Sequence, residues 1–289
     1  MSTYEQGLML NKICVDSRFR SPSSKSDSDF TIELPETIML PPGTKCYVTD
    51  VSIVHSWYSI ERDTSDKLFF TYKKNDDTFN VIITLASQNY SLDSLADEIK
   101  NRFSQTLASS PAWVRNSFKP NVTAYGTLGI ITIANSVFED TGMFYIWSDE
   151  DLQKTSFHRE WDGGYYNIFY PGTINKKIKN YKTQTNTAVN PFASGFVDLL
   201  THHNIYIKSS QLGSFQNIGP NGERDILKKV LVAVPFGELI ADFWINDQDF
   251  TDCSKLTLKT LHFRVTDVYN IPLNLNGHHV SFSLIFSSM

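Results

Sequence analysis

Cysteine is scarce in this sequence of 289 residues: the three cysteines are Cys14, Cys46 and Cys253, and their spacing matches no zinc-binding pattern. An odd and sparse set of this kind indicates reduced thiols in a protein made in a reducing compartment. No apolar run approaches the roughly 20 residues of a membrane-spanning helix. The first residues also lack the basic region and the apolar core of a signal peptide, so we expect neither a leader nor a membrane span.

Excess positive charge is missing as well. Lys and Arg number 26 against 31 Asp and Glu, which gives a formal net charge of −5. Non-specific binding of nucleic acid needs a basic face, so we expect no specific nucleic-acid partner. One basic patch is present, with Lys176, Lys177, Lys179 and Lys182 around Tyr181. It is typical of a solvated loop, although a contact with an acidic neighbouring subunit or with a single strand would use the same residue types.

The sequence contains none of the short motifs that mark common active sites. It has no glycine-rich phosphate loop, no G-x-S-x-G elbow, no C-x-x-C pair and no H-E-x-x-H helix. The histidines of the pairs His202-His203 and His278-His279 are adjacent, so on a strand they point to opposite faces and do not converge on a metal. We therefore expect no enzymatic activity, no cofactor and no metal site.

Alternation of apolar and polar residues with a period of two is the main pattern that is present. It runs through residues 261–266 and again through residues 280–286, and each run is typical of a half-buried β-strand. Asn276-Gly277 lies between them and predicts a tight connection, because both residues tolerate positive φ angles. The final strand is expected to be buried in the core.

Two changes of parity predict β-bulges, one near Asp50 and one between Leu258 and Leu261. A short strand is expected from Phe30 to Leu34, where Pro35 would stop it. Hairpins are predicted over residues 68–85 and 121–134. One helix is predicted after Ser91, which is a good N-cap residue.

Together these patterns give about ten to twelve short strands and one helix, which predicts an all-β protein built as an antiparallel β-sandwich or barrel. Residues 1–29 are predicted to form an N-terminal arm. Residues 30–136 and 226–289 are predicted to form the main β domain, with a loop-rich insertion at residues 137–225.

Two sets of apolar side chains are candidates for contacts with other molecules. The arm holds more apolar residues than a solvated tail needs, and those expected to contact a partner are Tyr4, Leu8, Leu10 and Phe19. Large aromatic residues in the insertion could stack on a glycan or contact a receptor, or could equally form the core of the insertion. They are Trp147, Trp161, Tyr165 and Tyr166.

Six short segments give a resemblance to a known family. Near the N-terminus they are VDSRFR at residues 15–20, SDFTIELP at 28–35 and CYVTD at 46–50. Near the C-terminus they are DCS at 252–254, TLHFRVTD at 260–267 and LNGHHVSFS at 275–283. Together they resemble the minor capsid, or penton, proteins of virophages and Polinton-like viruses.

The resemblance implies a single jelly roll, five copies of which close each fivefold vertex of an icosahedral capsid. It implies a homopentamer that contacts the major capsid protein of the same virus, with a host-surface receptor as a further partner. The protein would be made in the cytoplasm or virus factory and reside in the virion. The alternatives are a minor or cement capsid protein between capsomers and a carbohydrate-binding β-sandwich module at the virion surface.

Overall fold

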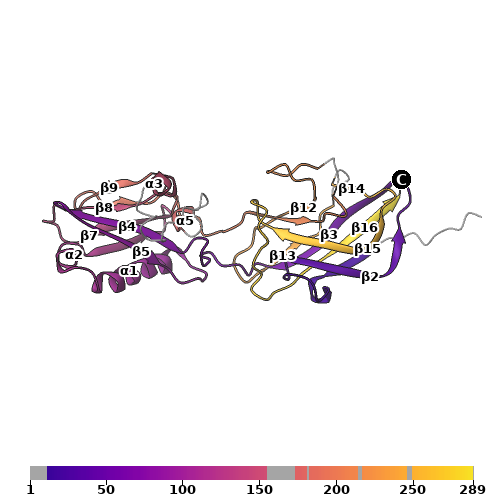
Figure 1. The fold of residues 1–289 in the computed structure, drawn as a ribbon, viewed down its shortest axis with the longest axis horizontal. Coiled ribbons are helices and arrows are strands. Elements are labelled where there is room, and N and C mark those ends of the chain that lie inside the picture. The colour runs from indigo at the N-terminus through magenta and orange to yellow at the C-terminus, as the bar shows by residue number, and fades with distance from the viewer. Residues whose placement is uncertain (1–11, 155–172, 181, 214–216, 246–248, 289) are drawn as a thin grey trace, which may run out of the picture. The chain divides into compact units, whose positions relative to one another are not determined.

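The computed structural model describes residues 12–154, 173–180, 182–213, 217–245 and 249–288, which fold as two compact units (Figure 1). Unit 1 consists of residues 1–57 and 202–289, and unit 2 consists of residues 58–201. Unit 2 is therefore inserted into unit 1 at a single point of the chain. In the described part of the chain no helix is both long enough and apolar enough to cross a membrane.

Unit 1 is a sandwich of two antiparallel sheets. One has the strand order β1-β16-β3-β13, with β14 also paired to β3, and the other has the order β12-β11-β15-β2. The strands are β1 (Lys12–Asp16), β2 (Asp29–Met39), β3 (Thr44–Val54), β11 (Asn204–Lys208), β12 (Ile226–Leu231), β13 (Leu239–Asp242), β14 (Thr251–Asp252), β15 (Thr257–Thr266) and β16 (Val280–Ser288).

The strand pairs of unit 1 are nested along the chain. The first strand pairs with the last, β2 pairs with β15, β3 pairs with β13 and β14, and β11 and β12 form the innermost pair. A ladder nested in this way and rolled into two sheets is a jelly roll. The predicted antiparallel sandwich with a single jelly roll is confirmed.

The two alternating runs near the C-terminus are both strands, but they do not form a hairpin. β15 pairs with β2 and β11, whereas β16 pairs with β1 and β3 in the other sheet. Residues 267–279 cross between the sheets, with positive φ angles at Asn276 and Gly277. The Phe263 ring on β15 meets the Phe282 ring on β16 with centroids 5.1 Å apart, so the two strands contact through the core.

Both predicted bulges are present. The register of β3 against β16 shifts where Asp50 adopts a φ of 52°, and the register of β15 against β2 shifts between Leu258 and Thr260. The expected end of a strand at Pro35 is wrong, because β2 continues to Met39. Pro35 lies in the irregular stretch of β2, where a residue without an N–H donor is tolerated.

Unit 2 contains two further antiparallel sheets, with strand orders β5-β4-β8-β9 and β10-β7-β6, and the long helix α1 (Leu92–Ala108). The other elements are β4 (Lys67–Lys74), β5 (Asp77–Thr84), α2 (Ala112–Ser117), β6 (Pro120–Tyr125), β7 (Ile130–Asn135), β8 (Met143–Ile146), α3 (Asp149–Lys154), α5 (Asn175–Ile178), β9 (Gln184–Asn186) and β10 (Phe192–Ala193). The predicted hairpins β4–β5 and β6–β7 are present, and Ser91 caps α1 with Ser94 as its capping-box partner.

The structure corrects the predicted domain boundaries. The hairpin β4–β5 and helix α1 share one hydrophobic core with β8 and Phe192, so the insertion begins at residue 58 rather than 137. It ends at residue 201 rather than 225, since β11 is a strand of the jelly roll. The predicted arm is also too long, because residues 12–16 form strand β1, in which the Val15 side chain is buried.

The insertion begins and ends at neighbouring points of the jelly roll. The rings of Trp57 and His202, the last residue before unit 2 and the first after it, have centroids 6.0 Å apart. Within unit 2, the Thr201 hydroxyl donates to the backbone oxygen of Tyr58 at 2.9 Å. Each unit thus holds the two ends of the insertion close together.

Candidate functional site

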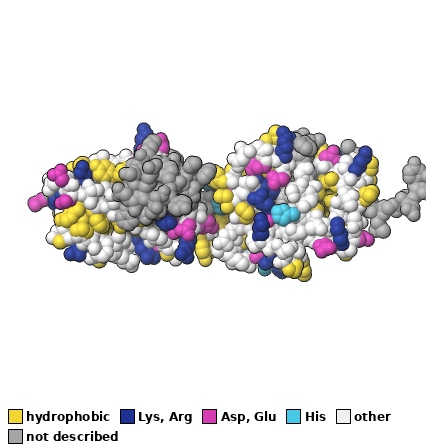
Figure 2. All heavy atoms as spheres, in the orientation of Figure 1, with side chains coloured by type: hydrophobic (Ala, Val, Ile, Leu, Met, Phe, Trp, Pro, Cys, Tyr) yellow, Lys and Arg dark blue, Asp and Glu magenta, His cyan; other side chains and the backbone are white. Residues whose placement is uncertain are grey.

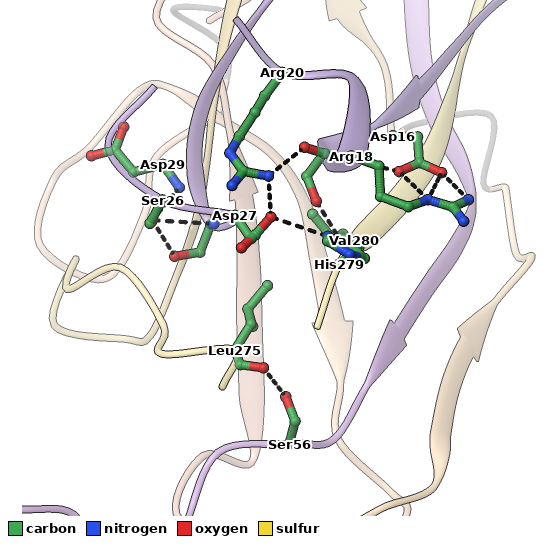
Figure 3. A network of polar contacts seen from close by, with 12 residues as sticks. Asp16, Arg18, Arg20, Ser26, Asp27, Asp29, Ser56, Leu275, His279 and Val280 are labelled. Carbon is green, nitrogen blue, oxygen red and sulfur yellow. Dashed lines mark hydrogen bonds and ion pairs between the residues drawn. The ribbon is translucent and has the colours of Figure 1, made fainter. Parts of the chain in front are cut away.

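Three of the segments that carry the family resemblance, residues 15–20, 28–35 and 275–283, meet in a group of polar contacts that we call the loop network (Figure 3). It joins the connection between β1 and β2 to residues 273–280. The buried Ser17 hydroxyl accepts a hydrogen bond from the Val280 backbone N–H at 3.1 Å. The buried Ser28 hydroxyl donates to the Leu273 backbone oxygen at 2.5 Å. Ser17 thus fixes the loop against the start of β16, and Ser28 fixes it against the connection that precedes β16.

Asp16 begins the loop network and is held by its neighbour Arg18. The Asp16 carboxylate caps the short 3₁₀ helix η1 (Ser17–Phe19) by accepting from the Arg18 backbone N–H at 2.9 Å. It also accepts from the Arg18 guanidinium at 3.0 Å. These hydrogen bonds hold the pKa of Asp16 below its usual range, against the opposing effect of partial burial.

Asp27 is the branching point of the loop network. Figure 3 shows Arg20 and His279 both reaching its carboxylate. The Nδ1 atom of His279 lies 3.1 Å from Asp27 Oδ1, and the Arg20 guanidinium also donates to the Ser17 backbone oxygen at 3.0 Å. Nearby, Nε2 of His262 lies 2.7 Å from Asp29 Oδ1. His262 and His279, from two C-terminal segments of the resemblance, therefore contact carboxylates from the opposite end of the sequence.

The last part of the loop network holds Ser56, which lies just before the start of unit 2. The Ser56 hydroxyl donates to the Leu275 backbone oxygen at 2.7 Å, and the Asn276 side-chain amide donates to the Ser56 backbone oxygen. Close by, His55 Nδ1 lies 2.9 Å from the Val234 backbone oxygen. The network's side chains bond to loop backbone or to one another, so the arrangement orders loops. Among the residues that the structure describes, no group of three or more His, Cys, Asp or Glu could hold a metal ion.

The chain is similar in fold to a viral penton protein. No family model matches the sequence, and no curated protein matches it. The crystal structure of the selenomethionine-labelled mavirus penton protein matches with a TM-score of 0.51 and 10% sequence identity. The match covers 96% of this chain and 99% of that one, so it includes both units. The resemblance found from the sequence is thus confirmed at the level of fold.

The predicted partner-contact residues are placed as follows. Tyr4, Leu8 and Leu10 lie outside the described residues. Phe19 is 80% exposed, which suits a contact with another molecule. It follows β1 and lies near the loop network, at the opposite end of that strand from Lys12.

The predicted glycan or receptor residues are not brought together within the described residues. Trp147 is half-buried beside Phe69 and Leu152, and its Nε1–H donates to the Thr71 hydroxyl at 2.8 Å. Trp161, Tyr165 and Tyr166 lie outside the described residues. Their role as a contact platform stays a prediction.

The lysines predicted to form a basic patch do not share one exposed surface. Lys177 is buried, and Lys179 Nζ lies 3.5 Å from Asp198 Oδ2. Lys182 is exposed. On the face shown in Figure 2, basic and acidic side chains are interspersed over both units.

Sequence reasoning missed an exposed apolar segment beside the jelly roll. After β13, Phe243 is 66% exposed, Trp244 is 87% exposed and Ile245 is 46% exposed. The segment borders a groove of about 750 Å³ whose lining includes Ile218 and Ile226. Lys228 Nζ fixes the segment by contacting Asp242 Oδ1 at 3.0 Å and the Trp244 backbone oxygen at 2.7 Å. The only sign of this segment in the sequence is a run of three large apolar residues after a strand, and such a run is also typical of a longer strand.

Proposed function

We propose that this chain is a structural capsid protein that forms pentamers at the fivefold vertices of an icosahedral virus shell. The observation that carries the proposal is the match to the mavirus penton protein over 96% of this chain. It includes the residues of the jelly roll and of the inserted unit, so the likeness is not limited to a common sandwich. The loop network supports a scaffold role, because its polar side chains hold loops.

In unit 1, strand β1 begins at one end of the sheet, and the chain leaves for unit 2 from the other end. Lys12 pairs with Ile285, which pairs with Tyr47 near the start of β3, so β1 begins at that end of the sheet. The chain departs for unit 2 after Trp57, beyond the other end of β3. We propose that residues 1–11 contact neighbouring capsid proteins, including the major capsid protein, and that unit 2 forms the part that projects from the vertex.

A closed ring needs a heterologous contact, in which two different surfaces of each copy meet. Trp244 is our candidate for one of these surfaces, because it is highly exposed and its backbone is held by Lys228. Exposed Trp residues on a fixed backbone are frequent centres of binding energy in interfaces.

The test is the solution mass of the full chain by light scattering coupled to size exclusion. A pentamer has five times 32.9 kDa, or about 165 kDa. A trimer would support the cement-protein alternative instead. If the isolated chain is a monomer, imaging of particles assembled with the major capsid protein decides, and density for this chain away from the fivefold axes would contradict the proposal.

A variant sharpens the test. Trp244→Ala is expected to weaken association by roughly tenfold or more, without loss of folding, because the side chain is exposed in one copy. Phe138→Ala is the matched control, since Phe138 is 77% exposed but belongs to unit 2. Equal effects of the two substitutions would remove Trp244 from the interface.

A further inference from the structure

Two of the three cysteines lie side by side inside the jelly roll. Cys46 on β3 is 2% exposed, and Cys253, directly after β14, is fully buried. Thr251 pairs with Cys46, and the Cys253 backbone N–H donates to the Thr44 oxygen at 2.9 Å. Cys253 is therefore the diagonal neighbour of Cys46 across the two strands, and both side chains point into the sandwich.

The two thiols also interact directly. The neighbouring Cys253 thiol, together with burial, raises the pKa of Cys46 far above its ordinary value. Since the thiolate is the reactive form, the raised pKa makes Cys46 unreactive towards thiol reagents while the protein stays folded. Cys14, by contrast, is exposed on β1 and provides an internal reference thiol.

We propose that Cys46 and Cys253 form a disulfide bond when the protein meets an oxidising low-molecular-weight disulfide such as oxidised glutathione. The bond would join β14 to β3 at the edge of the sheet. This inference concerns unit 1 alone and does not depend on the capsid role.

The geometry is close to what the bond requires. A disulfide usually needs Cα atoms within about 7 Å, and diagonal neighbours on antiparallel strands lie about 7–8 Å apart, so the bond needs a small backbone shift. Cys253 begins a turn in which the Leu256 N–H donates to the Cys253 oxygen at 3.2 Å. A turn residue can make the small backbone shift that a residue inside a long strand cannot. β14 has only two residues, so local opening of this edge gives the reagent access.

The chemistry is two successive thiol–disulfide exchanges. The thiolate of one cysteine attacks oxidised glutathione, whose S–S bond breaks to give a mixed disulfide and one glutathione thiolate. The thiolate of the second cysteine then attacks the protein sulfur of the mixed disulfide and releases the second glutathione. The two protons lost by the protein thiols go to the two glutathione thiolates. Both cysteines are oxidised, and one molecule of oxidised glutathione is reduced to two of glutathione.

The first experiment counts thiols in the full-length chain. The reduced protein is incubated with oxidised glutathione, denatured, alkylated and analysed by intact mass and peptide mapping. We expect a disulfide linking the peptides of Cys46 and Cys253, loss of two hydrogen atoms at that pair, and reversal by dithiothreitol. Alkylation of both cysteines after oxidation, or glutathione retained on either of them, would overturn the proposal. A bond from Cys14 to either would do the same.

Variants separate the bond from general oxidation. Cys14→Ser is expected to keep the Cys46–Cys253 bond, because Cys14 is exposed and takes no part. In Cys253→Ser, Cys46 is expected to remain alkylatable. Because a buried substitution can disturb folding, a second measurement compares oxidised and reduced Cys14→Ser. Oxidation should raise the unfolding temperature by about 5 to 10 °C, since the bond closes a loop that contains all of unit 2. An unchanged or lowered unfolding temperature would show that the bond does not stabilise the pairing of β14 with β3.

Discussion

The two units achieve the same antiparallel pairing by opposite routes. In unit 1 nearly every strand pairs with one from the other half of the sequence, as Lys12 does with Ile285. In unit 2 the main pairs are hairpins between consecutive strands, and helix α1 packs on β6 shortly after it in the chain. Unit 1 can therefore be completed only when the last strand is present, whereas unit 2 is closed by contacts within one continuous segment.

The comparison predicts that the units unfold separately and depend on different residues. Phe263→Ala should lower the free energy of unfolding of unit 1 by about 3 to 5 kcal/mol, because its ring is fully buried between Phe30 and Phe282. Phe118→Ala should do the same for unit 2, where the ring contacts Phe70 and Phe144. Calorimetry of the full chain should show each substitution moving a different transition. A common shift of a single transition would contradict separate unfolding.

The next largest effect is expected from the buried charge of unit 2. The Asp140 carboxylate is fully buried and accepts hydrogen bonds from the Tyr72 hydroxyl at 2.6 Å and Lys74 Nζ at 2.8 Å. Burial of the Tyr72 hydroxyl and its hydrogen bond to Asp140 raise the pKa of Tyr72. Asp140→Ala should cost about 3 kcal/mol, because it leaves these donors without their acceptor. Asp63→Asn removes an exposed negative charge paired with Lys67 and keeps a residue type that tolerates the positive φ at this position, so it is the control, with little expected change in denaturant titrations.

A smaller effect is expected in the loop network of unit 1. Ser17→Ala should lower stability by about 1 to 2 kcal/mol, because the buried Val280 N–H loses its acceptor. Ser23→Ala changes an exposed serine of the same loop and should have almost no effect. Hydrogen exchange of the Val280 amide distinguishes the two variants, with faster exchange expected only in Ser17→Ala. Equal exchange in both would show that the contact contributes nothing.

The last prediction concerns the ion pair of Lys208 and Glu223, whose contribution to stability is present at neutral pH and changes only in acid. Burial alone would raise the pKa of Glu223, but hydrogen bonds from Lys208 Nζ and from backbone amides lower it from 4.5 to about 2. Its contribution to stability is therefore complete above pH 4.5 and is lost as the pH falls towards 2. Acid titration of unit 1 should show this loss, and Glu223→Gln should not. An identical acid profile in the variant would contradict the assignment.

Local features of the fold could be predicted from the sequence, and distant ones could not. The cap of α1 at Ser91 and the bulge at Asp50 depend on a few adjacent residues, and both predictions are confirmed. The tight connection expected between β15 and β16 is instead a crossing between the two sheets, because alternation identifies a strand without identifying its partner. The boundary at residue 58 was missed for the same reason. Nothing local shows that the β4–β5 hairpin shares a core with Phe192.

The candidate site follows the same rule. The motif residues of the loop network were identified as a group, but their contacts, such as Asp27 with His279, join opposite ends of the chain. No spacing in the sequence encodes those contacts. The exposed segment at Phe243 and Trp244 could not be recognised from the sequence, because exposure depends on which neighbours are present.

The adjacency of Trp57 and His202 has an evolutionary consequence. A segment whose two ends leave a scaffold side by side can be replaced by another folded segment without altering the scaffold's own strand pairs. Recombination could therefore exchange the inserted unit between related genes while the jelly roll is kept. The same position is a suitable place to graft a foreign domain, for display on whatever assembly the jelly roll builds.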